Sequence, residues 1–316
     1  MTRSVRGFTK PASLRPGATL AVISPASTPK AELVERGLAE LEALGYRVKL
    51  GRHALNRGPL YYAGSLKDRL EDLHNAFADP DVDGVICTRG GWGSAELLPH
   101  LNIDVIRSNA KAFIGYSDHT SLHSWFQNEA KLVSFYAPMV ASDFARENGV
   151  DLLSWNHTFS ADDSWTLGAA DGLRVIQPGI ATGDLLGGCI SILAAGLGTP
   201  YAPQLEGSVL FLEDIGTKPY QWDRMLLHLR YSGRLDGVRG IIFGDMALCV
   251  GEEEQLLLER SLQHGLRGFE GPVAIGLRCG HVNGTNVSLP LGISVTLDLR
   301  DADNPYIRFM EAAVSR

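Results

Sequence analysis

The 316-residue sequence lacks an uninterrupted apolar run of about 18 residues, which argues against a membrane-spanning helix. It also lacks a basic excess: 29 Lys and Arg stand against 36 Asp and Glu, giving a formal net charge of -7 and a pI near 5.7. Such a chain offers no positive field to a phosphate backbone, so nucleic acid is not expected as a partner. Residues 1–17 contain no apolar segment of the kind that a secretory signal needs. We therefore expect a cytoplasmic protein.

Cysteine is scarce and widely spaced. The four cysteines form no C-x-x-C pair, and each lies in or beside an apolar or glycine-rich segment: Cys87, Cys189, Cys249 and Cys279. Because metal sites usually contain closely spaced ligand pairs, we expect buried thiols rather than zinc ligands or disulfides. The sequence has neither a G-x-G-x-x-G nor a G-x-x-x-x-G-K-[ST] motif, so the usual signals of nucleotide binding are missing as well.

The first half of the chain alternates short apolar runs with helix-like segments. The apolar runs are rich in Val, Ile and Ala without polar alternation, which is typical of strands buried on both faces of a parallel sheet. We expect strands at 17–24, 46–50, 83–88, 111–115 and 131–136, and helices at 31–45 and 67–79. The pattern predicts an N-terminal, doubly wound α/β domain over residues 1–165.

The second half mixes helix and strand signals in an order that the pattern does not settle. Residues 160–182 are rich in Gly, Asp and Ala without a helical period, so we interpret 166–182 as a linker. Beyond it we expect helices at 187–198 and 219–233, strands at 207–214 and 240–246, and one-sided β structure at 287–300. These signals predict a C-terminal mixed α/β domain over residues 183–316.

A serine stands where one predicted strand ends. In FIGYSDHTSLHSWF, residues 113–126, Ser117 lies between the strand and an amphipathic helix. The carboxyl ends of strands face the ligand crevice in open α/β sheets, and a tight strand-to-helix turn exposes a nucleophilic hydroxyl. The motif is G-x-S-x-H and matches the G-x-S-x-G elbow only in part. The alternative is that Ser117 or Asp118 simply caps the helix.

Other polar positions follow strands in the same way. In CTRGGWGS, residues 87–94, the glycines can offer N–H groups to a phosphate or an oxyanion, or can serve only a tight turn. Glu213 and Asp214 end the strand SVLFLED, and His281 lies in the glycine-rich stretch GLRCGHVNG. A serine nucleophile needs a base, and the base needs an orienting partner. Ser117, His281 and Glu213 can fill these roles, although Asp214 can equally be a helix cap and His281 an ordinary histidine.

Two further groups of residues have simpler explanations. His119 and His123 lie four apart on a predicted helix and can face one metal ion, but no H-E-x-x-H motif or nearby third ligand accompanies them. The acidic run 252–254 is explained as the solvated first turn of a helix.

Several segments together resemble one family, the LD-carboxypeptidases, which are serine peptidases of bacterial cell-wall recycling. The likeness covers most of the chain in the family's order, and the combination is specific although each segment alone is weak. The segments are RPGATLAVISPAS (15–27), YYAGSLKDRLEDLHNAFADPDVDGVICTRGGWGS (61–94), FIGYSDHTSLH (113–123), GDLLGGCISILAAGLGTP (183–200), LFLEDIGTKPYQWDRMLLHLRYSG (210–233) and GHVNGTNVSLPLG (280–292).

The resemblance implies a role for each of three residues: Ser117 as nucleophile, His281 as general base and Glu213 as its orienting carboxylate. It implies a site formed where the two domains meet, a homodimer, and a reaction that requires no metal or organic cofactor. The implied reaction is hydrolysis, through an acyl-enzyme, of the amide between the L-centre of meso-diaminopimelate and the terminal D-alanine of a murein tetrapeptide.

Other substrate-site residues follow from position. The backbone N–H groups of Gly91 and Asp118 are the expected oxyanion donors, because one follows a glycine turn and the other starts a helix. Arg89 and Lys218 are the cations nearest to the motifs and are candidates for binding the substrate's free carboxylate. Trp92 stands where family members often carry tyrosine, and either ring can wall a substrate pocket.

Two competing interpretations stay open. A sister branch, the microcin C immunity peptidases, cleaves an amide that links a peptide to a nucleotide-like group; its members are typically longer and differ from the EDIG-x-x-PY form at 213–220. From another class, a two-domain protein can close on a small ligand without chemistry. Such a protein has no need for a serine, a histidine and a glutamate within hydrogen-bonding reach.

Overall fold

The computed structural model describes residues 7–162, 164–246 and 248–316. Residues 1–6, part of the segment interpreted as lacking a secretory signal, lie outside this range. Among the described residues, no helix combines the length and apolarity that a membrane span requires.

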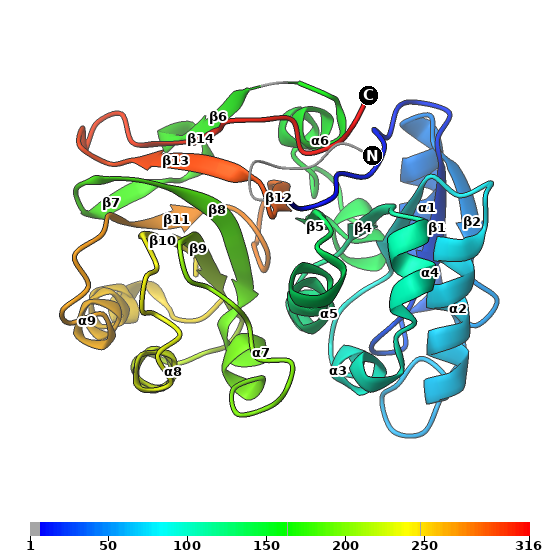
Figure 1. Cartoon of the computed structure of the whole chain (residues 1–316), viewed down its shortest axis with the longest axis horizontal. Helices are drawn as coiled ribbons and strands as arrows, with labels where there is room; N and C mark the ends of the chain where they lie inside the picture. The colour runs from blue at the N-terminus through cyan, green and yellow to red at the C-terminus, as the bar shows by residue number, and fades with distance from the viewer. Residues whose placement is uncertain (1–6, 163, 247) are drawn as a thin grey trace.

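The first sheet confirms the predicted parallel α/β architecture. Its strand order is β12-β5-β4-β3-β1-β2, and β1 to β5 are parallel to their neighbours whereas β12 runs antiparallel to β5. The strands are β1 (Thr19–Ile23), β2 (Arg47–Leu50), β3 (Gly84–Cys87), β4 (Ala112–Ile114), β5 (Ser134–Tyr136) and β12 (Leu289–Leu291). Because β12 comes from the far end of the chain, the C-terminal half completes the N-terminal sheet (Figure 1).

Amphipathic helices flank this sheet. Helix α2 begins with a capping box in which the Ser65 hydroxyl accepts a hydrogen bond from the Asp68 N–H and the Asp68 carboxylate accepts one from the Ser65 N–H. Such caps stabilise a helix by about 1 kcal/mol. The buried face of α2 includes Leu73 and Phe77. The helices of this half are α1 (Ala31–Ala43), α2 (Leu66–Ala78), α3 (Ser94–Leu97), α4 (Ile103–Ser108), α5 (Thr120–Trp125) and α6 (Leu152–Phe159).

The second sheet is mixed, as predicted. Its order is β6-β14-β13-β8-β9-β10-β11-β7, with parallel pairing from β8 to β11 and antiparallel pairing elsewhere. Its strands are β6 (Trp165–Gly168), β7 (Arg174–Gln177), β8 (Ile180–Cys189), β9 (Ser208–Glu213), β10 (Gly240–Gly244), β11 (Val273–Leu277), β13 (Ser294–Asp298) and β14 (Tyr306–Phe309). Helices α7 (Ile190–Ala195), α8 (Pro219–Tyr231) and α9 (Gln255–Gly265) lie together on one side of it (Figure 1).

The segment 166–182 differs from its interpretation as a linker. It contains most of β6, all of β7 and the start of β8, and β6 and β7 form the two edges of the second sheet. Short edge strands are half exposed and rich in turn residues, so their sequences resemble a connecting segment. By strand pairing the segment belongs to the C-terminal half, and the division into domains at 1–165 and 183–316 stays a prediction.

The helix expected at 187–198 is shorter than predicted. Strand β8 continues to Cys189, and α7 occupies only Ile190–Ala195. Gly187 and Gly188 have φ angles of 123° and 138°, which side-chain-bearing residues rarely adopt. A Cβ on Gly187 would overlap the backbone of Phe211, so these glycines allow close packing of β8 on its neighbours.

One apolar core runs from the first sheet to the second. It joins Phe113 and Phe135 of the first sheet with Val209 and Phe211 of the second, all fully buried. A smaller core lies between the second sheet and helices α7 to α9. The continuity of the larger core fixes the carboxyl end of β4 relative to that of β9, where the candidate residues lie.

Candidate active site

Ser117 occupies a strained turn between β4 and α5. Its φ is 64°, in the left-handed region that non-glycine residues seldom enter and that costs on the order of 1–3 kcal/mol. The turn leaves the side chain half-buried, at the edge of a cavity. Gly90 of the glycine-rich loop packs directly against it, since a Cβ at position 90 would stand 2.9 Å from the Ser117 Oγ. Backbone strain at a hydroxyl that lines a cavity is typical of a nucleophile turn.

Glu213 and His281 form a hydrogen-bonded pair. One carboxylate oxygen of Glu213, Oε2, accepts hydrogen bonds from the His281 backbone N–H at 2.9 Å and from its Nδ1 at 2.7 Å. Gly280 makes this approach possible, because its φ is 90° and a Cβ there would lie 2.5 Å from the Glu213 Cδ. With its proton on Nδ1, His281 keeps Nε2 free to accept a proton.

The interaction within this pair also changes the pKa values of both side chains. Burial by itself disfavours the charged form of His281, but the Glu213 carboxylate outweighs burial and raises the pKa of His281 above its ordinary 6.5. For Glu213, burial alone would raise the pKa, yet the charge and hydrogen bonds of His281, together with a hydrogen bond from Tyr136, lower it below 4.5. The resulting arrangement is a histidine held by a buried carboxylate, which is the geometry expected of a general base.

Ser117 and His281 line one cavity of about 430 Å³ between the two halves of the chain, and Glu213 lies buried behind His281. The structure therefore brings together the three residues that the sequence analysis paired chemically. The other lining residues are Lys30, Leu33, Arg89, Gly90, Gly91, Tyr116, Met139, Ala141, Ser142 and Ile215.

Two of the residues expected around the substrate lie at this cavity. Gly91 has a φ of 110°, and a Cβ there would overlap the Ser27 hydroxyl, so the position requires glycine. Arg89 is exposed and lines the cavity, as does Lys30 at the start of α1, a cation that the sequence analysis did not identify. Lys30 precedes a helix pattern in the sequence, but only the fold shows that it faces the same space as Ser117.

Trp92 and Lys218 lie elsewhere. Trp92 lines a separate cavity with Ile192 and Tyr201, and its backbone N–H donates a hydrogen bond to the Ser27 hydroxyl. The positive φ of Gly93, 138°, belongs to the turn that carries the loop on into α3. Lys218 is exposed at the start of α8 and is not among the residues that line the Ser117 cavity.

Asp118 is a cap, but for a different helix from the one predicted. Its carboxylate accepts a hydrogen bond from the Ser94 N–H, at the start of α3, at 2.8 Å. The side chain is buried, and burial raises its pKa to about 6 despite that hydrogen bond. The backbone N–H of Asp118 is close to the glycine loop, since a Cβ on Gly90 would stand 3.3 Å from it.

His119 and His123 use both ring nitrogens in hydrogen bonds. His119 Nε2 donates to the Arg89 carbonyl and Nδ1 bonds the Ser94 hydroxyl, both at 2.9 Å. His123 Nε2 donates to the Gly115 carbonyl at 2.7 Å and Nδ1 bonds the Ser134 hydroxyl at 2.8 Å. Burial lowers their pKa values to about 3 and about 4, so both rings are neutral. The two histidines hold the turn at Ser117 and the glycine-rich loop at 87–94 in place, and neither ring has a nitrogen free for a metal.

Tyr136, at the end of β5, is a site residue that the sequence analysis missed. Its hydroxyl accepts a hydrogen bond from the Ser117 N–H at 3.0 Å and donates one to Glu213 Oε1. A tyrosine inside the apolar run KLVSFY has the pattern of a core residue, and nothing local distinguishes it. The four cysteines, by contrast, are buried free thiols as predicted.

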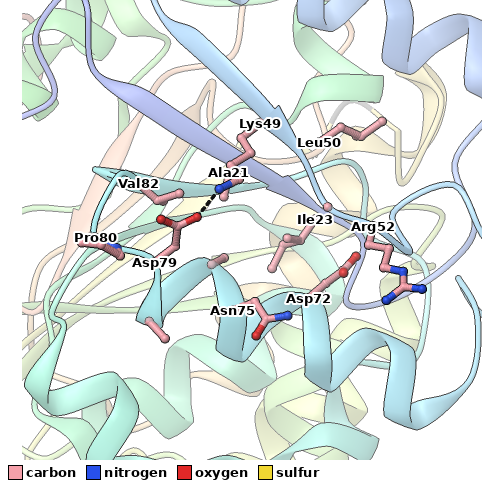
Figure 2. A pocket seen from close by; sticks show the side chains of 13 residues that line it. Ala21, Ile23, Lys49, Leu50, Arg52, Asp72, Asn75, Asp79, Pro80 and Val82 are labelled. Carbon is pink, nitrogen blue, oxygen red and sulfur yellow. Dashed lines mark hydrogen bonds and ion pairs between the residues drawn. The ribbon is translucent and has the colours of Figure 1, made fainter.

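A larger cavity, of about 560 Å³, lies far from these residues at the β2 edge of the first sheet. Figure 2 shows Asp72 and Asn75 of α2 beside Ile23, with the Lys49–Asp79 ion pair at one end. The Asp72 carboxylate accepts a hydrogen bond from the His53 backbone N–H at 2.9 Å, which ties down the chain after β2. This hollow contains none of the candidate catalytic residues.

A strained serine, a histidine and a buried carboxylate at the ends of strands are the components of a serine hydrolase of the α/β class. The sequence matches two family descriptions, the LD-carboxypeptidase N-terminal domain over residues 20–137 and the LD-carboxypeptidase C-terminal domain over residues 182–297. The chain belongs to the LD-carboxypeptidase family, a family of hydrolases.

Individual relatives agree with this assignment. The chain is 36% identical over 293 residues to a probable murein peptide carboxypeptidase of Bacillus subtilis, covering 92% of this chain and 91% of the relative. It is 32% identical to the murein tetrapeptide carboxypeptidase of Pseudomonas aeruginosa, covering 88% and 92%.

Two solved structures have the same fold. A muramoyltetrapeptide carboxypeptidase from Oxalobacter formigenes superposes with a TM-score of 0.81 at 26% identity, covering 93% of this chain and 99% of that one. An MccF-like protein from Bacillus anthracis superposes with a TM-score of 0.86 at 26% identity, covering 95% and 99%.

Proposed function

We propose that this protein is a serine LD-carboxypeptidase that hydrolyses the amide between the L-centre of meso-diaminopimelate and the terminal D-alanine of a murein tetrapeptide. The observation that carries the proposal is the Glu213–His281 pair, which faces the same cavity as the strained Ser117. The names of the Bacillus and Pseudomonas relatives support murein peptides as the substrate class.

The catalytic cycle follows from these positions. Nε2 of His281 removes the Ser117 proton as Oγ attacks the amide carbonyl, and the Glu213 carboxylate stabilises the imidazolium that forms. His281 then protonates the departing amino group of D-alanine, leaving an ester between Ser117 and the peptide. Water, activated by the same nitrogen, hydrolyses that ester and restores the serine.

The oxyanion of the tetrahedral intermediate is bound in this proposal by the backbone N–H groups of Gly91 and Asp118. Gly91 lines the cavity, and the Asp118 N–H stands at the junction of the nucleophile turn and the glycine loop. Loss of one such donor typically costs on the order of 10²-fold in rate.

The free carboxylate of the substrate is bound by cations of the cavity wall. Arg89 and Lys30 lie on different elements and both line the cavity with Ser117. Their positions favour them over Lys218, which does not line that cavity. Arg89→Ala and Lys30→Ala are each expected to raise KM for a tetrapeptide more than they lower kcat, because they contact a group that is charged in both substrate and transition state.

A microcin-type activity is the second candidate, and the fold of the Bacillus anthracis MccF-like protein supports it. An assay of one enzyme preparation on a murein tetrapeptide and on an aminoacyl sulfamoyl adenosine decides between the two. Release of D-alanine alone supports the cell-wall activity, whereas cleavage of the nucleotide-like substrate alone supports the alternative. A binding protein without chemistry cleaves neither.

The remaining expectations concern the assembly and the compartment. We propose a homodimer, on the family resemblance, and a location in the cytoplasm. Light scattering coupled to size-exclusion chromatography tests the dimer, and fractionation of cells that express the tagged full-length chain tests the compartment.

A further inference from the structure

We infer that Tyr136 is a positioning residue that couples the nucleophile turn to the catalytic carboxylate, an inference that rests on the proposed serine peptidase function. Its hydroxyl is hydrogen-bonded to both: it accepts from the Ser117 backbone N–H at 3.0 Å and donates to Glu213 Oε1. Ser117 follows β4 of the first sheet and Glu213 ends β9 of the second. One phenol therefore joins the two halves of the site.

The directions of these hydrogen bonds are determined by their partners. A backbone N–H can only donate, so the Tyr136 oxygen accepts from Ser117, and the carboxylate can only accept, so the phenol proton is directed at Glu213. The tyrosine is fully buried, and burial raises the pKa of its hydroxyl well above 10, so the proton stays in place at every working pH.

Glu213 uses its two oxygens for two different tasks. Oε2 takes both hydrogen bonds from His281, and Oε1 takes the one from Tyr136. The carboxylate cannot rotate without losing the hydrogen bonds of one of its oxygens. Tyr136 therefore fixes the plane in which Glu213 presents Oε2 to the imidazole. Donation to Oε1 also withdraws negative charge from the carboxylate and moderates its effect on the pKa of His281.

At Ser117 the hydrogen bond supports a conformation that is unfavourable by itself. Ser117 has a φ of 64°, and its N–H donates a hydrogen bond to the phenol oxygen, which anchors the start of the strained turn. Without that acceptor the turn can relax toward ordinary φ values, which would move Oγ away from its position beside Gly90.

The surroundings of Tyr136 are adapted to its ring. Gly188 of β8 packs against it, since a Cβ there would stand 2.9 Å from the Tyr136 Cε2, and the rings of Tyr116, His123 and Phe211 surround it at centroid distances of 5.6–5.9 Å. Next to Tyr136, the Cys189 N–H donates a hydrogen bond to the Thr120 hydroxyl at 3.0 Å. This hydrogen bond also joins the two halves of the chain. The tyrosine is thus held rigidly enough to position its two partners.

The test compares Tyr136→Phe with the wild type and with Tyr46→Phe. Tyr46 is a buried tyrosine of the same half whose hydroxyl accepts a hydrogen bond from Trp155 Nε1 at 3.0 Å, away from the site. The kinetics of D-alanine release from a murein tetrapeptide are measured across pH. Tyr136→Phe should lower kcat by about 10- to 100-fold, the range seen when the outer-shell groups that orient metal-ligating side chains are removed, with KM nearly unchanged.

The pH profile separates positioning from mere packing. Without the phenol proton, Glu213 carries more negative charge and stabilises the imidazolium more strongly, so the acid limb of kcat/KM should move to higher pH in Tyr136→Phe. Tyr46→Phe should keep the wild-type kcat and profile. A wild-type kcat together with an unchanged acid limb of kcat/KM in Tyr136→Phe would overturn the inference. So would a loss of activity no larger than the loss of folded protein measured by circular dichroism.

A second variant covers the case in which Tyr136→Phe does not fold. Incorporation of 3-fluorotyrosine at position 136 keeps both hydrogen bonds but makes the phenol a stronger donor, so the acid limb should move to lower pH. An unchanged acid limb would count against the inference.

Labelling of Ser117 by a fluorophosphonate provides a readout that needs no peptide. If the wild type releases no D-alanine, the substrate assignment fails, while slower labelling of Tyr136→Phe than of Tyr46→Phe still supports the role of Tyr136 and equal rates contradict it.

Discussion

Gly90 lies so close to Ser117 that a Cβ on it would stand 2.8 Å from the serine Cβ and 2.9 Å from Oγ. The glycine-rich loop and the nucleophile turn are thus fitted to each other without room for a side chain. This contact explains why the loop after β3 and the turn after β4, which are neighbouring strands, form one wall of the cavity.

The first prediction concerns this contact. Gly90→Ala should displace Ser117 and reduce kcat/KM by at least 10²-fold, while overpacking destabilises the fold by about 1–3 kcal/mol. Gly251→Ala is the matched control, because a Cβ at position 251 meets nothing within 4 Å. Steady-state kinetics and urea unfolding of both variants provide the comparison, and near-normal turnover by Gly90→Ala would contradict the packing argument.

A second prediction follows from the raised pKa of His281. The base must be neutral to accept the serine proton, so kcat/KM should fall as pH drops through a midpoint above 6.5. Glu213→Gln removes the charge that raises this pKa, so the midpoint should move to lower pH and the plateau rate should fall. If the midpoint stays in place in Glu213→Gln, the carboxylate does not control the base.

The third prediction uses the buried carboxyl of Asp118. Its pKa is about 6 in the folded protein against 3.8 for the ordinary group, so the folded state binds the proton more tightly. Stability is therefore lost as pH rises from about 4 to about 6, by roughly 3 kcal/mol at 1.36 kcal/mol per pKa unit. Asp118→Asn should remove this loss and be more stable than the wild type at pH 7.5 but not at pH 4.

Urea unfolding at the two pH values measures this difference. Asp236→Asn, at an exposed position, controls for the change of charge. Equal pH dependence in Asp118→Asn and the wild type would show that the Asp118 carboxyl titrates normally.

A fourth prediction concerns metals. Both ring nitrogens of His119 and His123 are hydrogen-bonded to protein groups, so neither ring is available as a ligand. Dialysis against a chelator should leave the rate of D-alanine release unchanged. A loss of activity that zinc restores would contradict this, and metal analysis of the purified protein would then locate the ion.

The sequence was most informative about the first sheet. Its strands are continuous apolar runs such as GVIC at 84–87, and burial on both faces requires that composition. It was least informative where pairing is between distant segments. Strand β12 joins the first sheet from residues 289–291, and the short edge strands in 166–182 have the composition of a connection.

The candidate site, like the fold, could be predicted from the sequence only in part. Ser117, Glu213 and His281 were identifiable because polar residues at strand ends are chemically unusual and because the motifs resemble a family. Tyr136 was not identifiable, since its role depends on two hydrogen bonds to residues 19 and 77 positions away. Trp92 lines a cavity separate from that of Ser117, so its expected role in the wall of the substrate pocket stays a prediction.

The central claim is that Ser117 is the nucleophile of a carboxypeptidase that removes D-alanine from murein tetrapeptides. The most direct test is mass spectrometry of a defined tetrapeptide incubated with the wild type and with Ser117→Ala, both shown to be folded. The wild type should produce the tripeptide and one D-alanine per molecule, and Ser117→Ala should produce neither above background. Undiminished release by Ser117→Ala would contradict the account.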